Sequence, residues 1–266
     1  MAAIYDRAER GPPDLPAREI VLGGGLELTD STGHTNVDRH AIGLMLRYLD
    51  PADTMVDVGA GTGIYSVLAG AIVGRRGRVE AIEPSPTVRP CLEANLRRNG
   101  LLNVNVHAKL AGTRRMLDPF VDGIGRSGRR RMPGRREWVK AEHILHIPSI
   151  QVDELLVGRR CSLMRIDVAG CELRVLQGAQ ELLRRPRAPA LLIACEEQAL
   201  ADFGHTPRHL LAWLAAHEYE TCFYDGERHL LMHSAAPWRV NRMLFAFPEQ
   251  ARNDISRRLA RRAEAA

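Results

Sequence analysis

The chain has 266 residues, 45% of them hydrophobic and 26% charged, a balance typical of one sizeable globular domain with short appendages. The sequence has no apolar run of about 18 residues, and its amino terminus lacks a basic segment followed by an apolar one, which argues against a membrane-spanning helix and a signal peptide. The net charge of +5 comes almost entirely from arginine, a general compositional bias that weakens the argument for nucleic-acid binding.

The five cysteines are scattered and form no CxxC pair, which is typical of a protein in a reducing cytoplasm. No spacing of histidine, cysteine or carboxylate residues suggests a metal centre, so we predict no required metal. We also expect no membrane association and allow for a homodimer.

In chain order, residues 1–36 contain clusters of proline and glycine at 11–13 and 23–25 and predict an irregular amino-terminal arm. Apolar residues at helical spacing follow over 37–49. Strands and helices then alternate: strand 55–58, helix 64–73, strand 78–82, helix 88–99 and strand 103–107. Gly100 stands where a cap of the second of these helices belongs.

Residues 112–146 interrupt this alternation with eight arginines and several glycines, and they predict an inserted loop that either covers a substrate or is merely solvated. The alternation resumes with strand 162–166, helix 172–183, strand 190–194, helix 207–217 and strands 221–224 and 242–247. A basic helix is expected at 250–263, within a terminal segment 249–266. The pattern predicts one α/β domain over 37–248, with a parallel sheet covered by helices on both faces.

The segment Met55-Val-Asp-Val-Gly-Ala-Gly-Thr-Gly63 leaves a predicted strand and enters a predicted helix. Its glycines allow a sharp turn close to a ligand, and the helix that follows offers free N–H groups to a carboxylate. The spacing G-x-G-x-G differs from the dinucleotide pattern G-x-G-x-x-G, and Asp57 would repel a pyrophosphate. The positive charges of S-adenosylmethionine (SAM) suit this acidic residue.

Glu83 ends the next predicted strand, where a carboxylate can accept hydrogen bonds from both ribose hydroxyls of a cofactor. Taken separately, the glycines could form an ordinary turn and Glu83 could be a surface residue. Together they predict a SAM site, with S-adenosylhomocysteine (SAH) as the product. The predicted cofactor contacts are Asp57, Gly59, Ala60, Gly61, Gly63, Tyr65, Glu83, Pro84, Ser85 and Asp167.

A second informative stretch runs from Leu163 to Ala179: an apolar strand, then Asp167, a turn at Gly170 and a helix. Because ligands bind at the carboxyl ends of the strands in such sheets, Asp167 is expected beside Asp57 and Glu83. Asp167 is our first choice for a base, or for a group that orients a hydroxyl; a helix N-cap is the alternative. Glu172 is a further catalytic candidate, although the helix dipole alone would favour it there.

The chain resembles the FkbM family of methyltransferases, whose signature IDVEG-x-E-x-x-VL-x-GA follows the glycine loop. Ile166, Asp167, Val168, Gly170, Glu172, Val175, Leu176, Gly178 and Ala179 match it. The segments 147–155 and 241–248 also look like the family, and the resemblance covers roughly 37–248. It implies a Rossmann-like class I methyltransferase fold with a mostly parallel seven-stranded sheet, and O-methylation of sugar or natural-product hydroxyls.

One position departs from the family, because Ala169 stands where its signature has glutamate. The sequence predicts Glu196, or its neighbour Glu197, as a replacement carboxylate at the end of the next strand. A histidine is the competing base, since its pKa lies near neutrality, and His34, His143 and His146 fall in predicted loops.

The leading hypothesis is therefore a small-molecule O-methyltransferase of specialised metabolism, whose acceptor could be anionic because of the arginine-rich insertion. The alternatives are methyl transfer to nitrogen or to RNA, and a SAM-binding partner protein without catalytic activity. A dehydrogenase is disfavoured by the glycine spacing.

Overall fold

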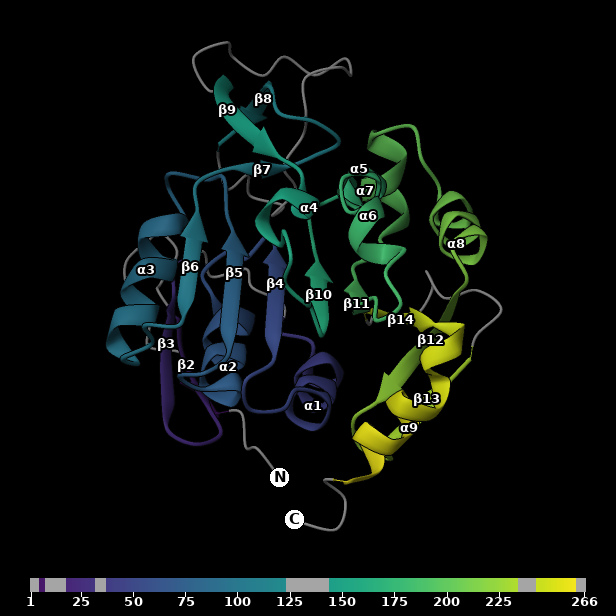
Figure 1. Ribbon diagram of the computed structural model, residues 1–266. Helices are drawn as coiled ribbons and strands as arrows, with labels where there is room; N and C mark the ends of the chain where they lie inside the picture. Colours follow the sequence, from purple (N-terminus) through teal and green to yellow (C-terminus); the bar gives the residue numbers. More distant parts are fainter. Residues whose placement is uncertain (1–4, 8–17, 32–36, 123–143, 234–242, 262–266) are drawn as a thin grey trace.

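The computed structural model describes residues 5–7, 18–31, 37–122, 144–233 and 243–261. Within these ranges the central sheet has eight strands, in the order β13-β12-β14-β11-β10-β4-β5-β6 (Figure 1). The strands are β4 (Thr54–Val58), β5 (Arg78–Ile82), β6 (Val104–His107), β10 (Leu163–Ile166), β11 (Ala190–Ile193), β12 (Tyr219–Asp225), β13 (Leu230–Met232) and β14 (Leu244–Pro248).

Five neighbouring strands, from β6 through β5, β4 and β10 to β11, pair in parallel. β14 runs antiparallel to both β11 and β12, and the short β13 pairs antiparallel with β12 at the sheet edge. The predicted mostly parallel α/β sheet is confirmed. β13 adds one strand to the seven expected.

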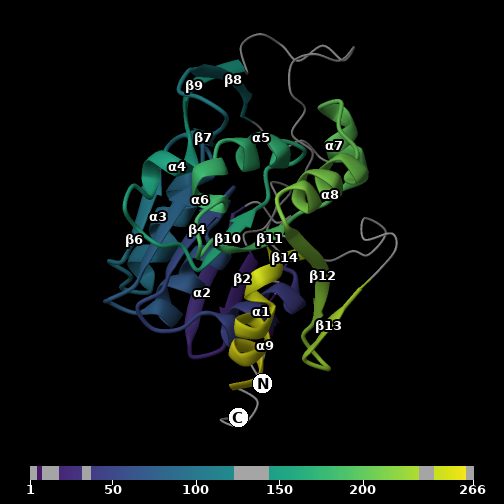
Figure 2. The same cartoon turned by 45° about the vertical axis from the view of Figure 1, so that its right-hand side comes forward.

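Helices cover both faces of the sheet because successive strand residues point to opposite sides. One apolar cluster joins β4 to α1 (Arg39–Tyr48), α2 (Ile64–Val73), α3 (Arg89–Arg98) and α9 (Arg252–Arg261). A second apolar cluster, on the opposite face of the sheet, joins β4 to α4 (Val152–Leu155), α5 (Glu172–Gln177), α6 (Gln180–Leu183) and α8 (Pro207–Ala216). α9 lies against α1, and the turn η3 (Glu249–Ala251) leads into it (Figure 2).

The predicted elements from 37 to 107 are found within about two residues of their expected bounds, and Gly100 follows α3 with a positive φ of 63°. The predicted helix 172–183 is instead two short helices, α5 and α6. A Cβ on Gly178, between them, would lie 2.0 Å from the carbonyl oxygen of Gly112. The helix is interrupted there because the carbonyl of Gly178 accepts from the amide of Asp153 at 3.2 Å and the amide of Leu182 donates to the carboxylate of Asp153 at 2.8 Å, instead of pairing with each other. α7 (Glu197–Asp202) was not anticipated.

The prediction of an irregular amino-terminal arm needs correction. The described part of this arm forms a three-stranded antiparallel sheet of β1 (Tyr5–Arg7), β2 (Arg18–Leu22) and β3 (Leu26–Asp30). The glycines at 23–25 are the hairpin turn, with positive φ at Gly24 and Gly25. Ile20, Leu22 and Leu28 are buried in the main core. The alternation of these apolar residues around the glycines was the signal that we missed.

A second small sheet lies beyond the carboxyl ends of the central strands (Figure 1). It has the order β7-β9-β8, with bounds Leu110–Ala111, Ile144–Ile150 and Leu117–Val121. The predicted insertion 112–146 therefore contains β8 and the beginning of β9, whereas residues 123–143, which carry most of its arginines, fall outside the described ranges. None of the helices described is long and apolar enough to cross a bilayer.

Candidate active site

The glycine loop connects β4 to α2, and its three glycines serve different purposes. Gly59, Gly61 and Gly63 all have positive φ, at 80°, 57° and 95°. A Cβ on Gly59 would lie 2.0 Å from the carbonyl oxygen of Asp167, and one on Gly63 would lie 2.4 Å from Leu92 Cδ1. A Cβ on Gly61 would meet nothing within 4 Å. Gly59 and Gly63 therefore permit packing of the loop, while Gly61 borders open space.

Glu83 follows β5, and its carboxylate is hydrogen-bonded to the glycine loop. Its Oε2 accepts a hydrogen bond of 2.8 Å from the amide of Gly61, and its Oε1 accepts one of 2.9 Å from the amide of Ser85. Ser85 is fully buried, and its Oγ accepts a hydrogen bond from the amide of Val88. Ser85 thus shapes the turn after β5, and Glu83 is held beside Gly61.

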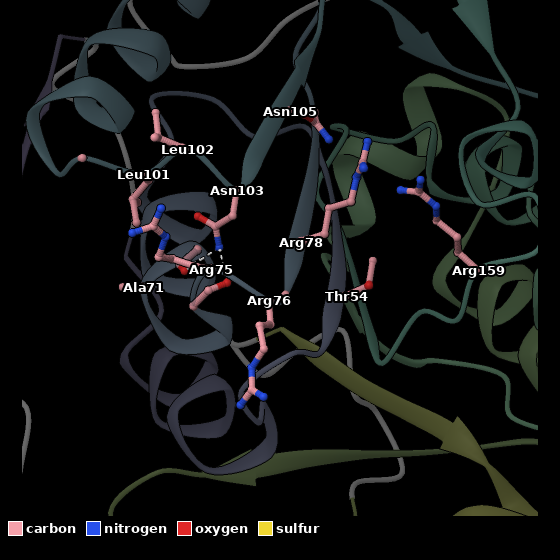
Figure 3. Close-up of a pocket in the computed structure, with 14 residues that line it drawn as sticks. Thr54, Ala71, Arg75, Arg76, Arg78, Leu101, Leu102, Asn103, Asn105 and Arg159 are labelled. Atoms are coloured by element: carbon pink, nitrogen blue, oxygen red, sulfur yellow. Dashed lines mark hydrogen bonds between the residues drawn. The ribbon is translucent and has the colours of Figure 1, made fainter.

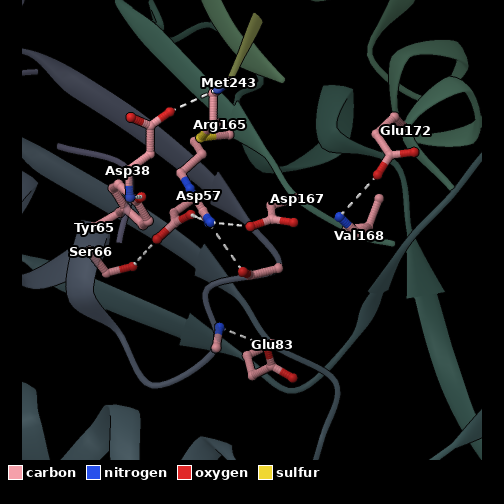
Figure 4. A network of polar contacts seen from close by, with 12 residues as sticks. Asp38, Asp57, Tyr65, Ser66, Glu83, Arg165, Asp167, Val168, Glu172 and Met243 are labelled. Carbon is pink, nitrogen blue, oxygen red and sulfur yellow. Dashed lines mark hydrogen bonds and ion pairs between the residues drawn. The ribbon is translucent and has the colours of Figure 1, made fainter. Parts of the chain in front are cut away.

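Asp57 lies inside the protein and does not line the cavity described below. Its Oδ2 accepts a hydrogen bond of 2.6 Å from Ser66 Oγ, and its Oδ1 lies 2.8 Å from Arg165 Nη1 (Figure 4). The side chain is 0% exposed. Asp57 was predicted to contact the cofactor, but its carboxylate is committed to two protein groups.

Arg165 is the residue that the sequence reasoning overlooked. Its guanidinium bridges the carboxylates of Asp57 and Asp167, donates to the carbonyl of Gly59 at 3.2 Å, and lies 4.0 Å from the ring centroid of Tyr65 (Figure 4). Burial opposes its charge, but the two carboxylates outweigh this and raise the pKa of Arg165 above its ordinary value. The available signal was a charged residue within an otherwise apolar strand.

Tyr65, another predicted cofactor contact, is also buried. Its hydroxyl accepts a hydrogen bond of 3.0 Å from the amide of Asp38, and burial raises its pKa to about 12. Asp38 in turn caps α1 by accepting hydrogen bonds from the amides of His40 and Ala41. Tyr65 therefore connects the guanidinium of Arg165 to the start of α1.

A cavity of about 260 Å³ opens at the carboxyl ends of β4, β5 and β10. Its floor includes Gly59, Gly61, Glu83, Pro84 and Asp167, which were predicted to lie together. The small sheet and the helices contribute the other wall, whose side chains were not predicted. These are Leu110, Arg114, Met116, Asp118, Phe120, Arg174 and Phe203.

The second signature forms the turn between β10 and α5, on the same cavity. The side chain of Asp167 is 46% exposed there. Ala169 adopts a positive φ of 49°, and a Cβ on Gly170 would lie 2.1 Å from the carbonyl oxygen of Ala199. The turn is thus confined between the cavity and α7.

Glu172 stabilises this turn through hydrogen bonds to its backbone amides. It is 2% exposed, and its Oε1 accepts hydrogen bonds from the amides of Gly170 at 3.0 Å and Val168 at 3.4 Å. Its Oε2 is buried without a hydrogen-bond partner among the described residues. Burial raises the pKa of Glu172 to about 7. Glu172 does not line the cavity.

The remaining candidate residues of the sequence analysis either do not line the cavity or fall outside the described ranges. Ala60, Gly63, Ser85 and Glu196 do not belong to the described lining of the cavity. Glu196 is exposed at the start of α7, and His146 is exposed on β9. His34 and His143 fall outside the described ranges.

A larger cavity, of about 730 Å³, lies at the amino ends of β4, β5 and β6, and Figure 3 shows its lining side chains. Arg75, Arg76, Arg78 and Arg159 line it, beside Gly74 and Gly100, which follow the ends of α2 and α3. The carboxyl ends of helices carry partial negative charge, which arginines complement and which would repel an anion. Arg75 and Arg76, which follow the end of α2, therefore have a structural explanation, and Arg78 pairs with Glu80, so the smaller cavity is the candidate site.

The smaller cavity fits SAM on three counts. Gly61 leaves open space where any side chain would intrude. The carboxylate of Glu83 is fixed beside it, at the position that suits ribose hydroxyls. The exposed carboxylate of Asp167 offers negative charge to a positively charged methionine end.

Known proteins show similarities to this chain. A sequence model described as "Methyltransferase FkbM domain" matches residues 57–221. The ribosomal protein L11 methyltransferase of Thermus thermophilus is 34% identical over 70 residues, which cover 26% of each chain. The structure of a methyltransferase FkbM from Methylobacillus flagellatus is 19% identical with a TM-score of 0.48, covering 73% of this chain and 43% of the other. A SAM-dependent methyltransferase from Aquifex aeolicus is 14% identical with a TM-score of 0.43, covering 79% and 87%.

The mostly parallel sheet, the glycine loop and the cavity at the carboxyl ends of its strands define a Rossmann-like α/β fold with a candidate SAM site. The family match spans well over half of the chain and contains both signatures. The chain belongs to the FkbM methyltransferase family. It spans only about a quarter of the curated relative and less than half of the FkbM methyltransferase structure.

Proposed function

We propose that this methyltransferase transfers the methyl group to a hydroxyl of a sugar or small natural product. The observation that carries the proposal is the position of Asp167, whose exposed carboxylate shares the cavity with Gly61 and Glu83. A hydroxyl is a poor nucleophile while it keeps its proton, and a carboxylate beside it can accept that proton or orient the oxygen.

The residues around the cavity have different roles in the proposed reaction. SAM supplies an electrophilic methyl group for an in-line displacement. Glu83 binds the ribose hydroxyls, and Gly61 lets the backbone approach the ligand. Asp167 orients the acceptor hydroxyl, so that alignment supplies much of the rate. Glu172 supports Asp167 through the turn that it holds.

The opposite wall of the cavity suggests the kind of acceptor. Met116, Phe120 and Phe203 provide apolar surface, while Arg114 and Arg174 provide guanidinium groups. Such a wall suits a partly apolar acceptor that carries a carboxylate or phosphate. We propose such an anionic compound of specialised metabolism, methylated in the cytoplasm. Glu196 stays a predicted catalytic residue.

The test is a panel of purified acceptors, namely nucleotide-linked sugars, hydroxylated acids, amines and RNA, with SAH release as the readout. We expect turnover on a hydroxyl compound, with the new methyl group assigned to oxygen by NMR. Asp167→Asn should lower that turnover by roughly 10²–10⁴-fold, while SAM affinity, which loses one facing negative charge, should fall only about tenfold. Methylation of an amine or of RNA alone would defeat the proposal, and near-normal turnover of the variant would remove Asp167 from the reaction.

A further inference from the structure

Arg165 and Asp57 face each other across two paired strands. They are direct partners in the register of β10 and β4, and Asp167 lies two residues after Arg165 on the same side. One guanidinium nitrogen, Nη1, contacts Asp57 and the carbonyl of Gly59, and the other, Nη2, contacts Asp167 (Figure 4). The planar fork of an arginine can hold these groups at once, whereas a lysine ammonium is a point charge.

The charges of this network are unevenly exposed. The side chains of Arg165 and Asp57 are 5% and 0% exposed, while that of Asp167 reaches the cavity. Two carboxylates share one guanidinium, so the group carries one net negative charge, and its accessible end is Asp167. SAM carries one net positive charge, while SAH, which lacks the sulfonium, is neutral overall.

We infer that Arg165 is a positioning residue through which the buried Asp57 acts on the cofactor. Arg165 fixes Gly59 through its carbonyl and Asp167 through its carboxylate, and both residues border the cavity, while Asp57 keeps the guanidinium in place. The glycine-loop aspartate thus contributes to SAM binding without touching it. The inference rests on SAM as the cofactor.

A double-mutant cycle tests this coupling, because residues that act through one another have non-additive effects. The variants are Arg165→Lys, Asp57→Asn and their combination, and the measurement is the calorimetric Kd for SAM and for SAH. We expect each single change to weaken SAM binding about tenfold and the double change to weaken it about tenfold also, rather than hundredfold. SAH binding should weaken by less than about threefold, because SAH lacks the charge that Asp167 faces.

Arg185→Lys is the matched control, since Arg185 is a half-buried arginine that donates to the carbonyls of Leu156 and Arg159, away from the cavity. Additive effects, or equal losses for SAM and SAH, would overturn the inference. If Arg165→Lys abolishes cooperative melting, the cycle of Asp57→Asn with Asp167→Asn carries the same test, because these carboxylates share the guanidinium. A wild-type protein that binds no SAM would defeat the cofactor assignment itself, a different result.

Discussion

At the scale of single residues, Glu83 connects the glycine loop to the turn after β5, because its two carboxylate oxygens accept hydrogen bonds from the amides of Gly61 and Ser85. We expect Glu83→Ala to weaken SAM binding at least tenfold, about 1.4 kcal/mol, by removing the ribose acceptor and loosening the loop. Calorimetry measures the change. Glu93→Ala on the outer side of α3 is the control, and an unchanged Kd for Glu83→Ala would contradict the assignment.

Glu172 makes the stability of the protein depend on pH. Its pKa is raised from 4.5 to about 7 in the folded chain, so between these values the unfolded chain releases the proton and the folded chain keeps it. The contribution of Glu172 to the free energy of unfolding therefore falls as the pH rises from about 4.5 to about 7, and it levels off above pH 7.

Glu172→Gln keeps an oxygen that can accept from Gly170 but carries no charge, so it should remove this fall. Between pH 5 and pH 8, urea unfolding of the wild type should lose on the order of 3 kcal/mol relative to Glu172→Gln. Glu93→Gln serves as the comparison on the protein surface. A constant difference between wild type and Glu172→Gln across this range would show that Glu172 does not titrate there.

At the scale of elements, the glycine loop is defined as much by its neighbours as by its own turn. Gly59 and Gly74 both have positive φ, but only Gly59 touches another backbone, that of Asp167. Gly74→Ala should lower the free energy of unfolding by about 1–3 kcal/mol from its backbone conformation alone, because φ 64° with ψ −173° is a region that essentially only glycine adopts. Gly59→Ala should cost clearly more and should abolish SAM binding, because β4 and β10 must separate. Urea unfolding and calorimetry compare the two, and equal costs would refute the close contact.

The elements also show where sequence reasoning succeeds. Helix and strand from 54 to 107 were predicted closely, because each has its own periodicity and its own glycine or proline boundary. The break at Gly178 depends on Asp153, which is distant in the chain and takes the hydrogen bonds that the helix would have made there. No local pattern could have revealed that contact.

At the scale of the whole molecule, Asn95 ties the amino-terminal sheet to the cofactor loop. Its Oδ1 accepts from the amide of Thr29, and its Nδ2 donates to the carbonyls of Thr29 and Thr62, all within 2.9 Å. Asn95→Ala should destabilise the protein by roughly 1–3 kcal/mol for each buried group left unpaired, and should weaken SAM binding. Asn99→Ala, one turn later and more exposed, should cost less. Thermal melts measure both, and equal losses would contradict the link.

Four features can be read from the amino-acid sequence alone: the mostly parallel sheet, the glycine loop, the placement of Glu83 and Asp167 at the carboxyl ends of the strands, and the family. These follow from local periodicity and from the rule that the carboxyl ends of parallel strands meet. Three further features become visible in the folded chain: Asp57 and Tyr65 are buried supports, Arg165 connects them to Asp167, and residues 18–30 form a hairpin that packs on the core. The physical reason is that burial and charge pairing depend on which strands lie side by side, as β4 and β10 do although they are about a hundred residues apart.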